Sequence, residues 1–337
     1  MNLLRTTFSA PGLRSLAWDG DALVDWLAGG RYSLDGTYES LNVGSSYRFD
    51  AAVGLGSWGV SFEAAGTKGR LLKDNGQRQS GNVHPMSVDI VREINRSYYH
   101  ADDYLYPVTL FQIPAGQPVL AHCPRGYNIL DIEDLDGNCL TPRPVDGAAD
   151  IFHSRLEASL DGRWLLSNGW VWHPLKIASV YDVARALAEP TYLSTSGEPL
   201  DLDYGEDLDW EIYGATFAGD RIVCAMTDED RKQSRLAIYD LTARRREASI
   251  ELSEIAGTQL MALDEDHIIL FGGHPRLVRL STGAIIERWD DLDGGAGIHQ
   301  PSVAFKPPQP PWLAADPPHA RFALGWPDRI VVISLSP

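Results

Sequence analysis

The chain has 337 residues, of which 44% are hydrophobic, and its 46 acidic against 29 basic residues give a net charge of −17. This charge disfavours nonspecific binding to nucleic acid or to anionic membranes and favours a basic partner. Cys123, Cys139 and Cys224 form no CxxC pair, the N-terminus makes a poor signal peptide, and no window approaches the roughly 18 apolar residues of a membrane helix. We therefore expect a cytoplasmic protein without a disulfide framework or a membrane span.

Taken in chain order, the sequence divides into seven units of roughly 30–50 residues, a period typical of repeat folds. The units cover residues 10–43, 47–91, 97–141, 150–193, 209–252, 256–290 and 300–335. Each contains short apolar segments separated by turn residues, which predicts strands. The clearest helical segment is Val180–Glu189, which Pro190 ends.

The best-preserved unit begins with a predicted hairpin over Ser154–Val171, whose turn is Asp161-Gly162-Arg163. Similar turns recur at Ala218–Arg221 and Asp264–His267, each followed by a strongly apolar strand. Four strands joined by three turns form one propeller blade. The sequence therefore predicts an all-β β-propeller of seven four-stranded blades in a single domain over residues 1–337, with six or eight blades as alternatives.

The two ends of the chain predict how the ring closes. Leu3–Ser9 is an isolated strand candidate ahead of the first unit, and the last unit has three clear strands, ending in Arg329–Leu335. A propeller must join its first and last blades, because otherwise strand edges stay exposed. We expect the N-terminal strand to pair with the last blade as its outer strand.

Two segments resemble WD40 repeats. Leu160–Ser167 is similar to that family's turn and second strand, while Val180-Tyr181-Asp182 and Ile238-Tyr239-Asp240 are similar to its Trp-Asp strand end, with Tyr in place of Trp. The Gly-His dipeptide of the family is missing ahead of a first strand, which makes the chain a divergent WD40-like propeller. The resemblance implies a binding platform and supplies no catalytic residues.

The densest polar and aromatic cluster lies near residue 100. It consists of Tyr98, Tyr99, His100, Asp102, Asp103 and Tyr104. A histidine beside two carboxylates can hold a metal or act as a base, but no second histidine stands at ligand spacing. The alternatives are a loop whose tyrosines pack on a neighbouring blade and, because tyrosine is enriched at interfaces, a binding surface. We predict a binding surface, with no metal and no cofactor.

A second candidate binding region is acidic and includes Asp201, Asp203, Glu206 and Asp207. Its alternating carboxylates resemble a calcium loop, but it lacks the Asp-Gly ending and the terminal bidentate glutamate. The remaining interpretations are a solvated charged loop and a negative patch that binds a basic protein.

Two other patterns favour packing over chemistry. An aromatic row is formed by Trp164, Trp170, Trp172 and His173. Trp170 and Trp172 share one face of the strand and could stack a sugar or a peptide, but propellers also need such side chains between blades. His122 and Cys123 are neighbours on a strand and point to opposite faces, so the histidine is not placed to activate the thiol.

The sequence thus predicts a non-enzymatic protein-binding propeller whose acidic surface recognises a basic protein. One version of this role is a bacterial immunity protein that neutralises a toxin domain. The alternatives are a propeller hydrolase with converging carboxylates in the central channel and a scaffold subunit of a larger assembly.

Overall fold

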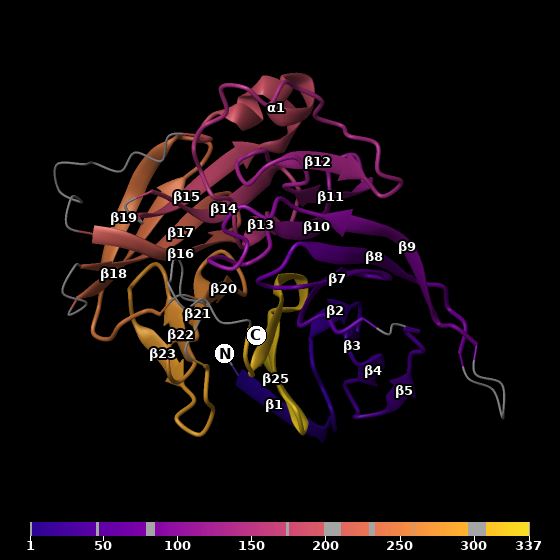
Figure 1. Ribbon diagram of the computed structural model, residues 1–337. Helices are drawn as coiled ribbons and strands as arrows, with labels where there is room; N and C mark the ends of the chain where they lie inside the picture. The colour runs from indigo at the N-terminus through magenta and orange to yellow at the C-terminus, as the bar shows by residue number, and fades with distance from the viewer. Residues whose placement is uncertain are drawn as a thin grey trace.

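The computed structural model describes residues 2–44, 47–78, 85–172, 175–198, 210–228, 233–257, 259–295 and 308–336. Within these ranges the strands form seven antiparallel sheets, which lie around a central axis as the blades of a propeller (Figure 1). In blades 1 to 6 the first strand in the chain is the innermost, and in blade 7 the innermost strand is β24. This arrangement confirms the predicted all-β propeller with seven blades.

The blades follow the predicted units. Blade 1 contains β2 (Ala17–Asp19), β3 (Ala22–Asp25), β4 (Gly30–Ser33) and β5 (Tyr38–Ser40), and blade 2 contains β6 (Ala51–Leu55), β7 (Trp58–Phe62), β8 (Lys68–Asp74) and β9 (Val88–Asn95). Blade 3 contains β10 (Val108–Gln112), β11 (Pro118–His122) and β12 (Asp131–Asp134), and blade 4 contains β13 (Leu156–Ala158), β14 (Trp164–Val171) and β15 (Leu175–Asp182).

Blade 5 contains β16 (Trp210–Ala218), β17 (Arg221–Asp228), β18 (Ser234–Asp240) and β19 (Arg245–Leu252), and blade 6 contains β20 (Leu260–Ala262), β21 (His267–Leu270), β22 (Arg276–Arg279) and β23 (Ile285–Arg288). Blade 7 contains β24 (Trp312–Asp316), the 3-10 turn η2 (Pro317–His319), β25 (Arg321–Trp326) and β26 (Arg329–Ser336), completed by β1 (Asn2–Ser9).

The ring closes as expected. β1 pairs antiparallel with β26 over its whole length, from Asn2 opposite Ser336 to Ser9 opposite Arg329. The strand order of blade 7 is β1-β26-β25-β24, so the N-terminal strand is the outer one. Covering β26 in this way leaves no long unpaired edge between the first and last blades.

Blades 3 and 4 differ from the four-stranded pattern, because each has three strands among the described residues. Single bridges stand in the place of the fourth strand, Glu133 with Cys139 in blade 3 and Val180 with Glu198 in blade 4. After β15 the chain turns into α1 (Val183–Ala188) and η1 (Pro190–Ser194).

The helix begins three residues later than the sequence predicts. Val180, Tyr181 and Asp182 still pair with β14, and the Asp182 side chain then caps α1 by accepting a hydrogen bond from the Arg185 amide. Pairing with the neighbouring strand thus overrides the local helix propensity at these three positions.

The predicted hairpin of blade 4 is present and depends on its glycine. Gly162 has φ of +69°, and a Cβ at this position would lie 1.8 Å from the carbonyl oxygen of Gln112 in blade 3. The Ser159 hydroxyl accepts a hydrogen bond from the Trp164 amide and fixes the turn. The conformation and the contact therefore both require glycine at position 162.

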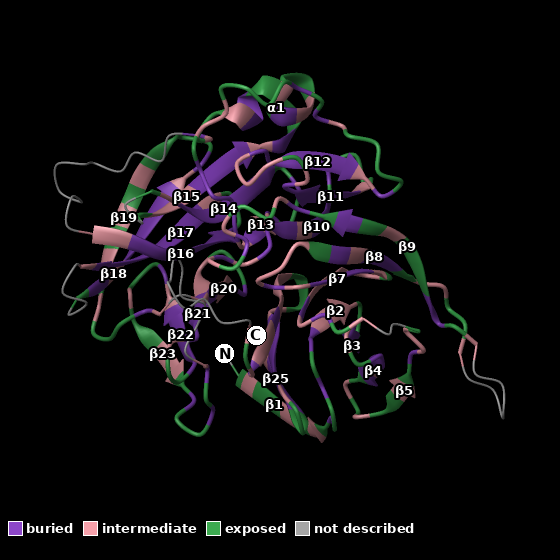
Figure 2. Cartoon of the chain, viewed as in Figure 1, coloured by how far each residue is buried: buried purple, intermediate pink, exposed green. Residues whose placement is uncertain are grey.

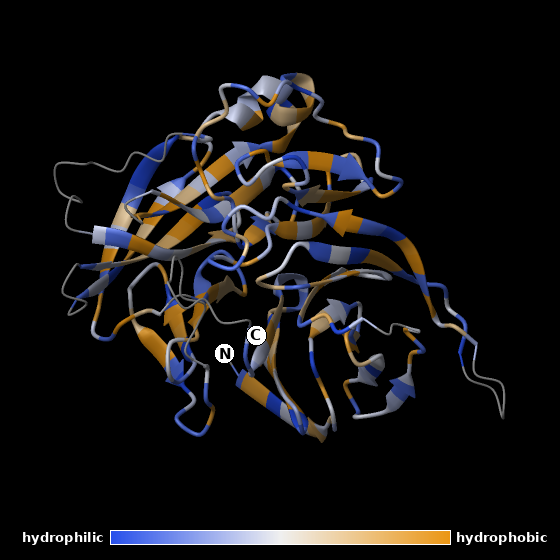
Figure 3. Cartoon of the chain, in the orientation of Figure 1, coloured by the Kyte–Doolittle hydropathy of each residue, from blue (hydrophilic) through white to orange (hydrophobic). Residues whose placement is uncertain are grey.

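The hydrophobic core consists of seven apolar clusters, each shared by two neighbouring blades among the described residues. Figure 2 shows that the buried residues concentrate in the middle strands of the blades, such as β14 and β17, and Figure 3 shows hydrophobic residues interspersed with hydrophilic ones along the strands. Trp164 belongs to the cluster between blades 4 and 5, which confirms its interpretation as packing between blades.

Candidate functional site

An additional buried cluster is almost entirely aromatic and contains Tyr104, Phe152 and Trp170. Phe152 and Trp170 stack with ring centroids 4.0 Å apart and planes 9° from parallel. Tyr127 stacks on Phe152 at 4.3 Å. These residues come from blades 3 and 4, and they form the base of the aromatic surface described next.

The aromatic surface consists of Tyr98, Tyr99, His100, Tyr127 and Trp172. Tyr99 lies 5.1 Å from Tyr127, and the His100 ring meets the edge of Trp172 at 5.1 Å, measured between ring centroids. Tyr98 is 85% exposed, Tyr99 41% and Trp172 40%. The connection between blades 2 and 3, the β11–β12 connection and the end of β14 thus present one group of aromatic side chains to solvent.

Carboxylates accompany this surface. The Tyr127 hydroxyl donates to Asp150 Oδ1 at 2.5 Å, and His100 Nδ1 lies 2.6 Å from Asp103 Oδ2. Burial and the neighbouring Asp150 raise the pKa of Tyr127 to about 12. Asp102 and Asp150 are exposed, so the surface combines aromatic faces with negative charge, which suits a cationic ligand.

Five of the six residues that the sequence singles out near position 100 lie at or beside this surface. Tyr104 is the exception, because its side chain is fully buried and stacks under the guanidinium of Arg96, 4.5 Å from the ring centroid. Burial also raises the pKa of the Tyr104 hydroxyl. Tyr104 therefore supports the loop and is not available to a partner.

Arg96 is a residue that the sequence analysis misses. Its Nη2 donates to the carbonyl oxygens of Ala101 and Tyr104, and its Nε donates to the carbonyl oxygen of Gly66. A buried arginine thus fixes the loop that carries Tyr98 and Tyr99. No local pattern marks it, because its partners are backbone groups.

The other predicted features have different outcomes. Asp201, Asp203, Glu206 and Asp207 lie outside the described residues. His122 Nε2 lies 3.1 Å from Glu133 Oε2 of the neighbouring strand, and burial raises the pKa of the Cys123 thiol. The expectation that this pair is not a catalytic thiol site is consistent with both observations.

The described residues supply neither a membrane-spanning helix nor a cluster of three metal-ligating side chains. No helix there is both long and apolar enough to cross a membrane. No three carboxylate, imidazole or thiol groups in the described ranges come together as metal ligands, and His100 with Asp102 and Asp103 is no exception.

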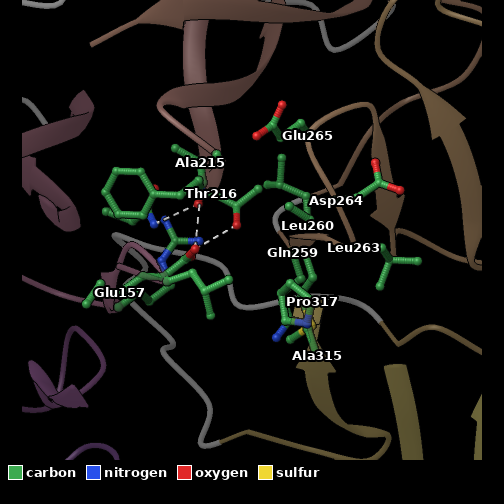
Figure 4. A pocket seen from close by; sticks show the side chains of 18 of the residues that line it. Glu157, Ala215, Thr216, Gln259, Leu260, Leu263, Asp264, Glu265, Ala315 and Pro317 are labelled. Carbon is green, nitrogen blue, oxygen red and sulfur yellow. Dashed lines mark hydrogen bonds between the residues drawn. The ribbon is translucent and has the colours of Figure 1, made fainter. Parts of the chain in front are cut away.

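A cavity of about 830 Å³ occupies the central channel beside blades 4 to 7. Its wall includes residues from the inner strands β13, β16, β20 and β24, together with Asn168 of β14. Figure 4 shows Glu157 and Thr216 on one side of the cavity, with Gln259, Leu263 and Pro317 across from them. Asp161, Asp220, Asp264 and Glu265 are exposed and stand at the turns after these strands, so they mark the mouth of the cavity.

Glu157 is the carboxylate that the strands hold within the channel. Its Oε1 accepts hydrogen bonds from Thr216 Oγ1 at 2.7 Å and from the Phe217 amide at 3.2 Å. Burial raises the pKa of Glu157 to about 7, and these two hydrogen bonds offset that effect only in part. The hydrolase alternative requires a second carboxylate converging on Glu157, whereas the four others lie at the exposed mouth.

The raised pKa of Glu157 makes stability depend on pH. The unfolded chain releases this proton near pH 4.5 and the folded chain near pH 7, so Glu157 lowers stability as pH rises between these values. We expect Glu157→Gln to match the native protein near pH 4.5 and to exceed it by about 1–3 kcal/mol at pH 8, since one pKa unit is worth about 1.4 kcal/mol. Urea unfolding of both proteins at the two pH values measures this, and an equal difference at both would contradict it.

No protein-family model matches the sequence, and no curated protein is significantly similar to it. Among solved structures, the chain is similar to the Dos1 propeller, with a TM-score of 0.54 and 9% identity over 98% of this chain and 94% of that one. It is also similar to a chain of the mitotic checkpoint complex, with a TM-score of 0.54 and 11% identity over 100% and 91% of the two chains.

A third similar structure is the computationally designed Ika8 protein, with a TM-score of 0.51 and 12% identity over 97% of this chain and 99% of that one. At these identities the likeness concerns the fold alone. Together with the seven sheets, it confirms the predicted β-propeller fold.

Proposed function

We propose that this propeller is a non-enzymatic binding protein that docks a basic protein partner on the aromatic surface. The observation that carries the proposal is the exposure of Tyr98, Tyr99 and Trp172 at one place on the molecule. Tyrosine and tryptophan are enriched among the residues that dominate binding energy at protein interfaces. The packing of the blades does not explain why these aromatic side chains are exposed together. Exposed apolar patches of this kind mark interaction sites.

Charge supports a basic partner. The whole chain carries a net charge of −17, and Asp102 and Asp150 are exposed beside the aromatic rings. Arginine and lysine side chains of a partner would meet both aromatic faces and carboxylates here, and the acidic field would accelerate encounter. A bacterial immunity protein that neutralises a basic toxin domain is one concrete form of this role, and it predicts a toxin-like gene next to this one.

Capture from the native host tests the proposal. The immobilised native protein should recover a stoichiometric partner at low salt and less of it at high salt. A Tyr98→Ala, Trp172→Ala variant should bind that partner at least 30-fold more weakly, because the loss of even one hot-spot residue costs about 2 kcal/mol or more.

The matched control is Leu4→Ala. Leu4 is 64% exposed but lies in β1, the outer strand of blade 7, away from the aromatic surface of blades 3 and 4 and outside the cavity lining. This variant should bind like the native protein. Recovery of no stoichiometric partner at either salt concentration, or equal binding by the surface variant, would contradict the proposal.

A further inference from the structure

The central cavity has unused hydrogen-bond acceptors on one wall. Asn168 of β14 is 5% exposed, and its Nδ2 donates to the Ala215 carbonyl oxygen at 3.1 Å, while its Oδ1 has no partner among the described residues. Glu157 contacts the next two residues, Thr216 and Phe217, through Oε1. Two side chains of blade 4 therefore lie against three consecutive residues of β16, with Asn168 Oδ1 and Glu157 Oε2 left over as acceptors.

A buried amide oxygen without a partner costs free energy, which a ligand that donates a hydrogen bond would recover. The Glu157 carboxylate is acceptor-only when ionised and can take further donors at Oε2. An ammonium group has three donors and no acceptor, and its charge would compensate that of Glu157. The wall is therefore complementary to a cationic donor group.

The charged residues of the lining favour a cationic ligand over an anionic one. Its apolar residues favour a ligand with an apolar body. The lining residues include five carboxylates and one guanidinium, that of Arg155, which donates to the Tyr213 carbonyl oxygen. This imbalance attracts cations into the channel. Most of the remaining wall is aliphatic or aromatic, including Leu156, Phe217 and Leu260. A cavity of about 830 Å³ is large enough for an organic molecule of ordinary ligand size.

We propose that the central channel binds an organic cation in which an ammonium group is carried on an apolar body, with the ammonium group placed at Glu157 and Asn168. The ligand is either a free amine or a lysine side chain inserted by a protein, since both present the same chemistry. The cavity opens among the turns that carry Asp161 and Asp264. This is the face opposite the end of β14, so the site does not rest on the proposed docking of a partner there.

Calorimetric titration of the purified native protein tests the site with three matched probes. 4-Phenylbutylamine should bind at least tenfold more tightly than 4-phenylbutan-1-ol, and 4-phenylbutyrate should show no binding. Equal affinity for the amine and the alcohol, or no binding of the amine at millimolar concentration, would overturn the proposal. This comparison needs no variant.

Two variants locate the site. Glu157→Gln keeps the acceptor for Thr216 and Phe217 but removes the charge, and it should weaken amine binding at least tenfold while leaving the alcohol unchanged. Asp136→Asn, which changes an exposed carboxylate outside the cavity lining, should change amine binding less than threefold. Unaltered amine binding by Glu157→Gln would contradict the assignment.

A third titration distinguishes a free amine from a protein's lysine side chain as the ligand. A blocked peptide with one lysine between apolar residues should bind more tightly than the free amine if a protein side chain is the ligand. Tighter binding of the free amine would indicate a small molecule. A partner captured on the aromatic surface would not change the result of either titration. A failed amine titration would therefore contradict the channel site alone, and a failed partner capture would contradict the proposed function alone.

Discussion

Replacing Arg143 with methionine is expected to lower the free energy of unfolding by about 3–5 kcal/mol, because the substitution leaves a buried carboxylate under-compensated. Arg143 and Asp131 are each 1% exposed in their side chains, and Arg143 Nη1 lies 2.8 Å from Asp131 Oδ1. Arg143 also donates to the carbonyl oxygen of Leu130 in blade 3 and to the hydroxyl of Ser194 in η1. It therefore ties together the outer parts of the two three-stranded blades.

Arg125 provides the matched control for this prediction. It also contacts Asp131, with both hydrogen bonds at 2.7 Å, but its side chain is 34% exposed. Arg125→Met should cost roughly 1 kcal/mol, as expected for a partly solvated ion pair. Urea unfolding of the three proteins measures both values. A loss for Arg143→Met no larger than that for Arg125→Met would show that the buried pair does not hold these blades.

Deleting the residues of β1 is expected to destabilise the ring by roughly 3–5 kcal/mol, because a ladder of hydrogen bonds worth about 0.5–1.5 kcal/mol each is lost. The deletion also uncovers β26, whose row of valine and isoleucine residues would become an unpaired edge. We expect a lower urea midpoint together with soluble aggregates in size-exclusion chromatography.

Adding the missing strand as a peptide separates strand pairing from other effects of the truncation. A peptide of residues 2–9 should restore the midpoint and the monomer peak when it is added in excess. The same peptide with Thr6→Pro should not, because proline disrupts a strand interior. Rescue by both peptides, or an unchanged midpoint after the deletion, would contradict strand-based closure.

The sequence predicts the blades well because each hairpin is determined by residues that lie close together in the chain. The turn at Asp161-Gly162 and the apolar strand that follows it are recognisable without any knowledge of distant residues, and the pairing of β1 with β26 follows from the need to close a ring. The three-stranded blades are not predictable in this way. There, a buried arginine and single bridges replace strand pairing.

The candidate sites are harder to predict, because they form between blades. Tyr99 stands out in the sequence, whereas its neighbours Tyr127 and Phe152 lie in connections with no periodic pattern. Glu157 offers one weak signal, a charged residue at the centre of the short inner strand β13. Its contact with Thr216 joins residues that are far apart in the chain, which no local rule anticipates.

Site-specific photo-crosslinking shows whether the aromatic surface is the face that meets a partner. A photo-reactive side chain is placed at position 98 in one protein and at position 4 in another, and both are expressed in the native host and irradiated. We expect a discrete covalent adduct with a basic protein from position 98 and none from position 4. An adduct from position 4 alone, or from neither position, would contradict the proposed docking face.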